Sequence, residues 1–149
     1  VWGRDTAPFL SESRYPAHAT ASGKVLLAAL PASCRPFAED TPLPALTPFT
    51  ITSPRRLGAE LVRVQGHRYA VSREELAIGT MSVAVPVGPL DRATVALSVS
   101  GPVTRLRLDV VARALQSAAA QTWGHACAAS NGRRVGRASG QQIGNVARP

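Results

Sequence analysis

Apolar residues recur with a helical period in three stretches of the chain, residues 20–30, 54–65 and 106–127. Small polar residues that can cap a helix stand at the start of the first two stretches, and Pro31 and Gly66 are placed to end them. We therefore predict three helices over these ranges. The apolar face of the third helix would consist of Leu106, Val110, Val111, Ala114, Leu115, Ala118, Ala119 and Trp123.

Between the second and third predicted helices the apolar pattern changes to a period of two. Residues 79–87 and 94–100 alternate apolar and small polar positions, and a turn-like sequence separates them at 88–92. This pattern predicts an antiparallel hairpin, and a short strand near Tyr69 and Val71 precedes it. Helices combined with antiparallel strands predict an α+β domain.

The length and composition of the chain fit one folded domain followed by a tail. Of its 149 residues, 45% are hydrophobic and 17% are charged, which is enough apolar material for a single core. We predict a domain over 1–128 and a disordered basic tail over 129–149. Because the chain begins at Val1 and its only methionine is Met81, we expect that upstream sequence is missing.

Neither a membrane segment nor a secretory leader is apparent in the chain. No stretch approaches the ~20 consecutive apolar residues that a membrane helix needs. The first residues lack the charged, apolar and small regions of a signal peptide. We therefore predict a cytoplasmic protein that does not contact a membrane.

The net charge of +8 is concentrated near the C-terminus. Residues 131–149 hold four arginines and no acidic residue, whereas the rest of the chain has 13 basic and 9 acidic groups. A strongly basic domain can indicate binding to nucleic acid, but this folded part is only weakly basic. Non-specific contact of the tail with nucleic acid is a separate alternative.

The residues most often used in catalysis or metal binding form no recognised motif. The histidines lie far apart and outside any HExxH pattern, and the cysteines do not form a CxxC pair. Lys24 follows a glycine, but Val25 stands where a phosphate-binding loop has Ser or Thr. We therefore predict a protein that is not an enzyme and has neither a cofactor nor a metal site. The histidines and cysteines are His18, His67, His125, Cys34 and Cys127.

Two groups of small residues are candidates for ligand binding. Ala21 and Ser22 begin the first predicted helix, where free backbone N–H groups favour a carboxylate or phosphate, although every helix has such an end. Three hydroxyl groups share one face of the predicted hairpin, which is either a solvated surface or, if helices cover it, a polar pocket. These hydroxyl groups belong to Ser82, Ser98 and Ser100. Ser72 and Glu75 have the spacing of a capping box, which predicts a structural role at a helix start.

Five segments of the chain, in order, resemble the effector-binding domain of the IclR-type bacterial transcription regulators. The first is the run PAHATASGKVLLA at 16–28, which resembles the family's signature. The others are TIT at 50–52, RYAVSREE at 68–75, SVAVPV at 82–87 and ALSVSGP at 96–102. Each segment is weak evidence alone, but together they extend over about residues 13–124.

The resemblance implies a GAF-related fold, in which helices pack on a curved antiparallel sheet, and a sensor of small organic or aromatic acids. By motif position, the backbone amides of Ala21 and Ser22 would hold the effector together with the side chains of Ser82, Ser98 and Ser100. Ser72 matches a position where some members have Asp. The effector would shift a homodimer or tetramer that binds operator DNA through a helix-turn-helix domain, which this chain does not contain.

The chain also departs from the family pattern. The first strands of the effector domain are mostly absent, residues 66–69 carry an insertion where the family often has Gly-Tyr, and Met81 stands where many relatives have Arg. The chain would thus be a partial effector domain. Two alternatives follow: a truncated remnant, or an oligomerisation or interaction module that binds no ligand. A small hydrolase is a further alternative, but no base is placed beside a serine.

Overall fold

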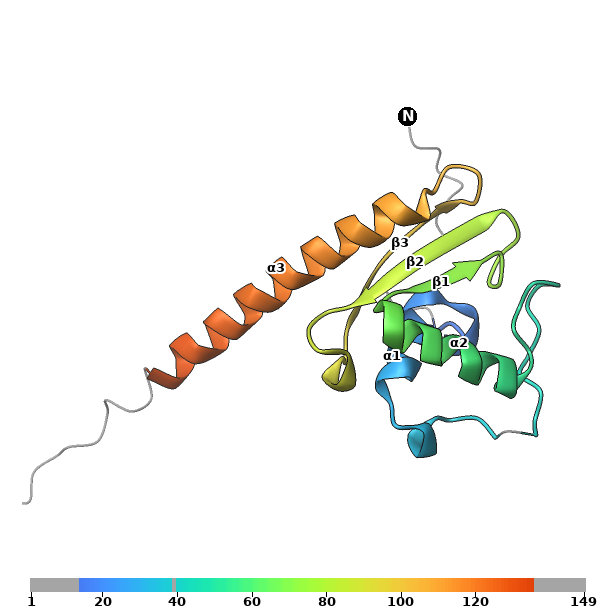
Figure 1. The fold of residues 1–149 in the computed structure, drawn as a ribbon, viewed down its shortest axis with the longest axis horizontal. Coiled ribbons are helices and arrows are strands. Elements are labelled where there is room, and N and C mark those ends of the chain that lie inside the picture. Colours follow the sequence, from blue (N-terminus) through green and yellow to red (C-terminus); the bar gives the residue numbers. More distant parts are fainter. Residues whose placement is uncertain (1–13, 39, 136–149) are drawn as a thin grey trace, which may run out of the picture.

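Three antiparallel strands form a sheet, and helices cover both of its faces (Figure 1). The structure is a computed structural model that describes residues 14–38 and 40–135, with side chains up to residue 129. The strands are β1 (Ala70–Arg73), β2 (Thr80–Pro86) and β3 (Ala96–Pro102), in that order across the sheet. The predicted α+β class and the predicted hairpin are therefore confirmed.

The helices α1 (Ala21–Ala29) and α2 (Pro54–His67) begin where their capping residues predict. The side-chain oxygen of Thr20 accepts a hydrogen bond from the backbone N–H of Gly23, 3.1 Å away, and so caps α1. Ser53 caps α2 in the same way by accepting from the N–H of Arg56. Short 3-10 helices lie at Ala17–Ala19, Ala32–Cys34 and Leu90–Arg92.

The predicted end of α2 at Gly66 is wrong. The helix continues through His67, and the residue in the left-handed conformation that ends it is Arg68, with φ of 59°. Its backbone N–H still reaches the carbonyl of Val64, 2.8 Å away. A left-handed helix end favours glycine but does not require it. Here α2 ends where the chain turns to join the sheet, and an arginine stands at that position.

Two separate hydrophobic cores lie on the two faces of the sheet. One core lies between α1, α2 and the sheet face that carries Ala84, and it contains Val25 and Leu61. The other lies between the opposite face and α3 (Leu108–Val135), and it contains Met81 and Leu115. The small alanines on the first face allow α1 to approach the strands closely, which positions the start of this helix over the sheet.

The helix α3 differs from the predicted helix at 106–127 in both length and buried face. It continues to Val135, so residues 129–135 of the predicted tail are helical, while residues 136–149 lie outside the described part. The sequence of α3 is rich in alanine up to Ala129, and no proline interrupts the helix before Val135. Of the predicted apolar face, Val110 is 52% exposed and Trp123 is 42% exposed. Figure 1 shows the later turns of α3 extending beyond the sheet.

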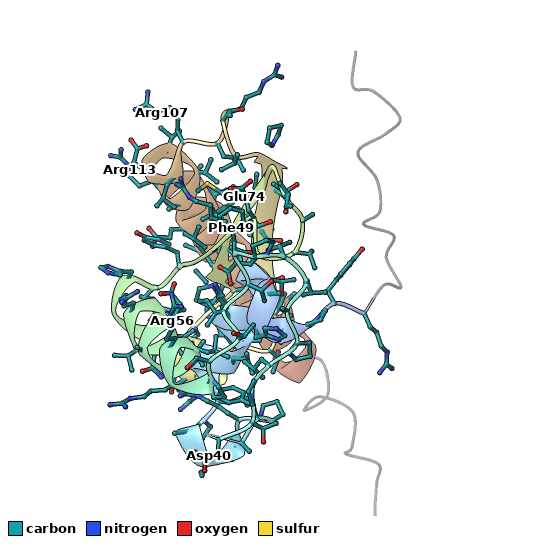
Figure 2. All side chains as sticks on the ribbon, turned by 90° about the vertical axis from the view of Figure 1, so that its right-hand side faces the viewer. Asp40, Phe49, Arg56, Glu74, Arg107 and Arg113 are labelled. Atoms are coloured by element: carbon teal, nitrogen blue, oxygen red, sulfur yellow. The ribbon has the colours of Figure 1, made fainter. Side chains whose placement is uncertain are left out.

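Charged side chains lie mainly on the surface (Figure 2). Arg107, just before α3, and Arg113, within this helix, both lie within ion-pair distance of Asp109, at 3.6 and 3.5 Å. Such exposed pairs contribute little to stability because water screens them. Within the part of the chain that the structure describes, none of the helices has the length and apolar character needed to cross a membrane.

Candidate functional site

A row of three serines crosses the sheet on the face that α1 covers. The strand register places Ser72 of β1 opposite Ser82 of β2, and Ser82 opposite Ser100 of β3. The hydroxyl oxygens of Ser82 and Ser100 are 2.7 Å apart and share a hydrogen bond. Because residues two apart in a strand share a face, Ser98 and Ala84 lie on this face as well.

A cavity of about 330 Å³ lies between this serine row and the first turn of α1. Its lining is a mixture of hydroxyl groups, small residues and larger apolar side chains, and none of the lining residues is charged. A site of this kind suits a small molecule with one polar end, which hydroxyl groups and backbone amides can hold. The lining residues are Tyr15, Ala17, Thr20, Ser22, Gly23, Leu26, Leu76, Ser82 and Ser100.

The first turn of α1 presents backbone N–H groups at this cavity. Thr20 satisfies the N–H groups of Gly23, through its hydroxyl, and of Lys24, through its carbonyl. The N–H groups of Ala21 and Ser22 precede these and have no acceptor within the helix. The positive end of the helix dipole therefore faces this cavity.

The predicted site residues do not all meet at this cavity. Ser22, Ser82 and Ser100 line it. The side chain of Ala21 is buried in the core, so this residue offers only its backbone amide. Ser98 is exposed and lies outside the lining.

Ser72 belongs to the same row but has a structural contact. Its hydroxyl is buried and donates to the carbonyl of Ala19, 2.7 Å away. This bond joins β1 to the segment just before α1. The predicted capping box is wrong, because Ser72 lies in strand β1 and Glu75 follows that strand without starting a helix.

A buried ion pair, which the sequence pattern did not predict, lies next to the cavity walls. Lys24 is 1% exposed, and its Nζ donates to Glu75 Oε1 at 2.5 Å and to the carbonyl of Val71 at 3.0 Å. Glu75 directly precedes Leu76, which lines the cavity, so the pair connects two of the cavity walls. The available signal was a single lysine within the apolar helix face, since a buried charge needs a partner.

Glycine at position 23 allows the cavity to form in this place. A Cβ atom there would collide with the carbonyl oxygen and the Cα atom of Ala17, and would lie 2.6 Å from the Thr20 hydroxyl. The backbone of α1 therefore packs directly against the preceding 3-10 helix. Both segments line the cavity, so this close approach sets their spacing.

The residues that could support catalysis or a metal lie elsewhere. No histidine lines the serine cavity, and His18 Nε2 is 2.9 Å from the carbonyl oxygen of Pro44. Cys34 and Cys127 are both exposed. Among the residues that the structure describes, no group of three His, Cys, Asp or Glu side chains could hold a metal ion.

Comparison with known proteins identifies related domains. Residues 12–124 match the family model "Bacterial transcriptional regulator IclR C-terminal". The "Probable transcriptional regulator SauR" of Cupriavidus necator is 41% identical over 99 residues, which are 65% of this chain and 39% of that protein. The chain thus spans about two-fifths of the length of this curated relative.

Solved structures of related domains share the fold. The inducer-binding domain of a PobR double mutant from Acinetobacter, in complex with 3-hydroxybenzoic acid, has a TM-score of 0.66 and 32% identity. The matched region covers 73% of this chain and 66% of the PobR chain. An IclR homologue from Microbacterium hydrocarbonoxydans, in complex with 4-hydroxybenzoate, has a TM-score of 0.65 and 28% identity. The matched region covers 72% of this chain and 44% of the homologue's chain.

Proposed function

Because the chain belongs to the IclR family of bacterial transcriptional regulators, as its C-terminal effector-binding domain, we propose that the serine cavity binds a small carboxylate-bearing effector. The observation that carries the proposal is the position of the Ser82–Ser100 hydroxyl pair, which lines one cavity together with the first turn of α1. The carboxylate would accept hydrogen bonds from the amides of Ala21 and Ser22. The two sheet hydroxyls would hold a second polar group of the effector.

The lining of the cavity favours a small aromatic acid among the possible effectors. Leu26 and Leu76 provide apolar surface for a ring, and Tyr15 also lines the cavity. The lining holds no cation, so the carboxylate depends on backbone amides and hydroxyl groups. The hydroxybenzoate complexes of the two similar structures support the same ligand class.

In the complete regulator, effector binding would change the affinity for operator DNA. The ligand would stabilise one arrangement of a cytoplasmic homodimer or tetramer over another, in proportion to its different affinity for each. Contact with DNA would come from a helix-turn-helix domain outside this chain. The domain itself performs no catalysis in this proposal.

A module that mediates subunit contacts without binding a ligand is the second candidate. Exposed apolar residues favour it: Val99 on the edge strand β3 is 40% exposed and Val110 on α3 is 52% exposed. Exposed apolar side chains mark a protein interface where they form a contiguous patch. The two candidates differ in whether the serine cavity has an occupant.

Thermal unfolding in the presence of 3- and 4-hydroxybenzoate tests the proposal. Binding to the native state alone raises the midpoint in a saturable way, so we expect a concentration-dependent rise for the unaltered chain. The double variant Ser82→Ala/Ser100→Ala should unfold cooperatively and lose most of this rise. Ser117→Ala, an exposed serine on α3, is the matched control and should keep it.

The same titration of Ser98→Ala decides whether this predicted residue contributes from the rim of the cavity. A cooperative transition that no hydroxybenzoate, benzoate or keto-acid moves would contradict ligand binding and support the subunit-contact module. A rise that persists unchanged in the double serine variant would place the ligand elsewhere.

A further inference from the structure

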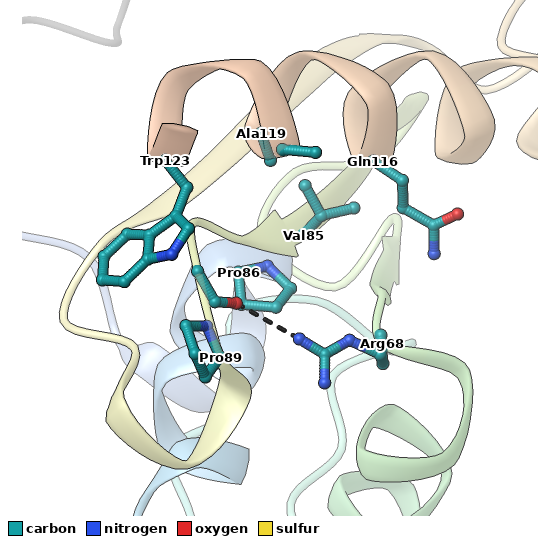
Figure 3. A pocket seen from close by; sticks show the side chains of 9 residues that line it. Arg68, Val85, Pro86, Pro89, Gln116, Ala119 and Trp123 are labelled. Atoms are coloured by element: carbon teal, nitrogen blue, oxygen red, sulfur yellow. Dashed lines mark hydrogen bonds between the residues drawn. The ribbon is translucent and has the colours of Figure 1, made fainter. Parts of the chain in front are cut away.

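A second cavity, of about 660 Å³, lies between α3 and the end of β2 (Figure 3). It shares no lining residue with the serine cavity. Its volume falls within the range of roughly 300–1,000 Å³ that is typical of small-molecule sites. The residues that matter for its chemistry are Arg68, Pro86, Pro89, Gln116, Ala119 and Trp123.

The indole ring of Trp123 forms one wall of this cavity and is held against the backbone. Gly88 has φ of 90°, and a Cβ atom there would lie 2.7 Å from the Trp123 ring. Only glycine at position 88 therefore lets the ring pack this closely. Trp123 is still 42% exposed, and Pro86 and Pro89 lie near it in Figure 3. Rigid rings of this kind provide a flat apolar surface at little entropic cost.

Arg68 supplies the charge at this cavity from an unfavourable backbone position. It adopts a left-handed conformation with φ of 59°, which favours glycine. The side chain nevertheless points toward the cavity, and its Nη2 donates to the carbonyl of Gly88, 3.2 Å away (Figure 3). Strain that a sequence retains in this way is common at functional sites.

The guanidinium of Arg68 has donors available for an anionic ligand. A guanidinium carries five N–H donors in a planar fork, and one hydrogen bond to Gly88 leaves most of them free to bind a carboxylate. Of the ion pairs found among the described residues, none includes Arg68. The carboxamide of Gln116 donates to the carbonyl of His67, 3.3 Å away, and so ties α3 to the end of α2 beside the guanidinium.

From this geometry we propose that the second cavity is a binding site for a flat aromatic carboxylate. The ring would lie against Trp123 and the prolines, and the carboxylate would pair with Arg68 in the bidentate geometry that guanidinium and carboxylate groups favour. This site differs in chemistry from the serine cavity, because a cation holds the anion here. It does not depend on the proposed function of the serine cavity.

The probe is 2-naphthoate, with the neutral 2-naphthamide as its isostere. Trp123 is one of two tryptophans in the chain, so the variant Trp2→Phe leaves its indole N–H as a single assigned resonance in an NMR titration. We expect naphthoate to shift this resonance in a saturable way, and the amide to bind on the order of tenfold more weakly because it lacks the charge. Equal affinity of the two compounds would overturn the proposal.

Arg68→Gly is the decisive variant, because glycine suits the left-handed backbone and removes the side chain together with its guanidinium. We expect this variant to unfold cooperatively and to lose about tenfold in naphthoate affinity. Arg56→Ala, which removes an exposed arginine from α2, the helix that ends at Arg68, should leave the affinity unchanged. An unchanged affinity in Arg68→Gly would overturn the site. Chemical-shift changes confined to the backbone amides of Ser22 and Gly23 would also overturn the second site. That result would instead support ligand binding at the serine cavity.

Discussion

Lys24 of α1 and Glu75, which follows β1, form a buried ion pair between residues 51 positions apart in the sequence. Their side chains are 1% and 8% exposed, and Nζ lies 2.5 Å from Oε1. The carbonyl of Val71 accepts a second hydrogen bond from Lys24, while Glu75 Oε2 is buried without a partner among the described residues. The pair fixes α1 against the segment that carries Leu76, and so holds two walls of the serine cavity at a fixed spacing.

Loss of one partner of this pair should destabilise the domain strongly. Lys24→Met leaves the carboxylate of Glu75 buried without a cation, and such a change costs about 3–5 kcal/mol. The double variant Lys24→Met/Glu75→Gln should recover much of the loss, because no buried charge remains. Urea unfolding measures the free energies. Arg63→Ala breaks the exposed pair with Glu60 and serves as the control, with a change of about 1 kcal/mol or less. Equal losses in Lys24→Met and Arg63→Ala would contradict the interpretation.

Gly23→Ala should disturb the close contact between α1 and the preceding 3-10 helix. The added methyl group would collide with backbone atoms of Ala17, which cannot move as a flexible side chain can, so we expect a loss of about 3 kcal/mol. Gly58→Ala is the matched control in α2, because a Cβ atom there meets nothing within 4 Å. This control should stabilise the domain by up to about 1 kcal/mol through helix propensity. Thermal or urea unfolding of both variants would test the contrast.

Ser72→Ala should lower stability through the loss of one buried hydrogen bond. The carbonyl of Ala19 would lose its donor in a buried position, at a cost of about 1–3 kcal/mol. Ser98→Ala, on the same face of the sheet but exposed, should change the free energy of unfolding by less than about 0.5 kcal/mol. If the two variants were equally stable in urea unfolding, the hydroxyl of Ser72 would have no structural role.

Gly88→Ala and Gly79→Ala separate backbone strain from the contact with Trp123. Both glycines have positive φ, of 90° and 78°, but a Cβ atom at Gly79 meets nothing within 4 Å. We expect Gly79→Ala to cost about 1–2 kcal/mol from strain alone, and Gly88→Ala to cost about 1–3 kcal/mol more. In the Trp2→Phe background, only Gly88→Ala should change the emission of Trp123. An unaltered emission spectrum would mean that the ring does not pack against this glycine in solution.

Local patterns in the sequence were sufficient to predict most of the fold. Thr20 and Ser53 begin helices because a cap depends on atoms within three residues, and the hairpin follows from alternation along neighbouring strands. The same alternation placed Ser82 and Ser100 on one face, where the structure shows their hydroxyls in contact. The family resemblance, confirmed over residues 12–124, rested on the order of such local segments.

The tertiary structure decided those features that depend on distant residues. Ser72 and Glu75 have the spacing of a capping box, yet pairing with β2 makes Ser72 part of a strand, and the ion pair with Lys24 engages Glu75. Ser98 lies on the same face of β3 as Ser100 but does not line the cavity. Which serines of this face line the cavity depends on the position of α1 and of the turn before it.

The sequence by itself therefore determined the element types, the helix starts and the serine face, since each reflects forces between near neighbours in the chain. Only the tertiary structure decided the partner of Lys24, the end of α2 at Arg68 and the lining of both cavities. These depend on which surfaces exclude water together. A buried charge or a closed cavity is a property of segments that meet in space, and no local pattern specifies which segments meet.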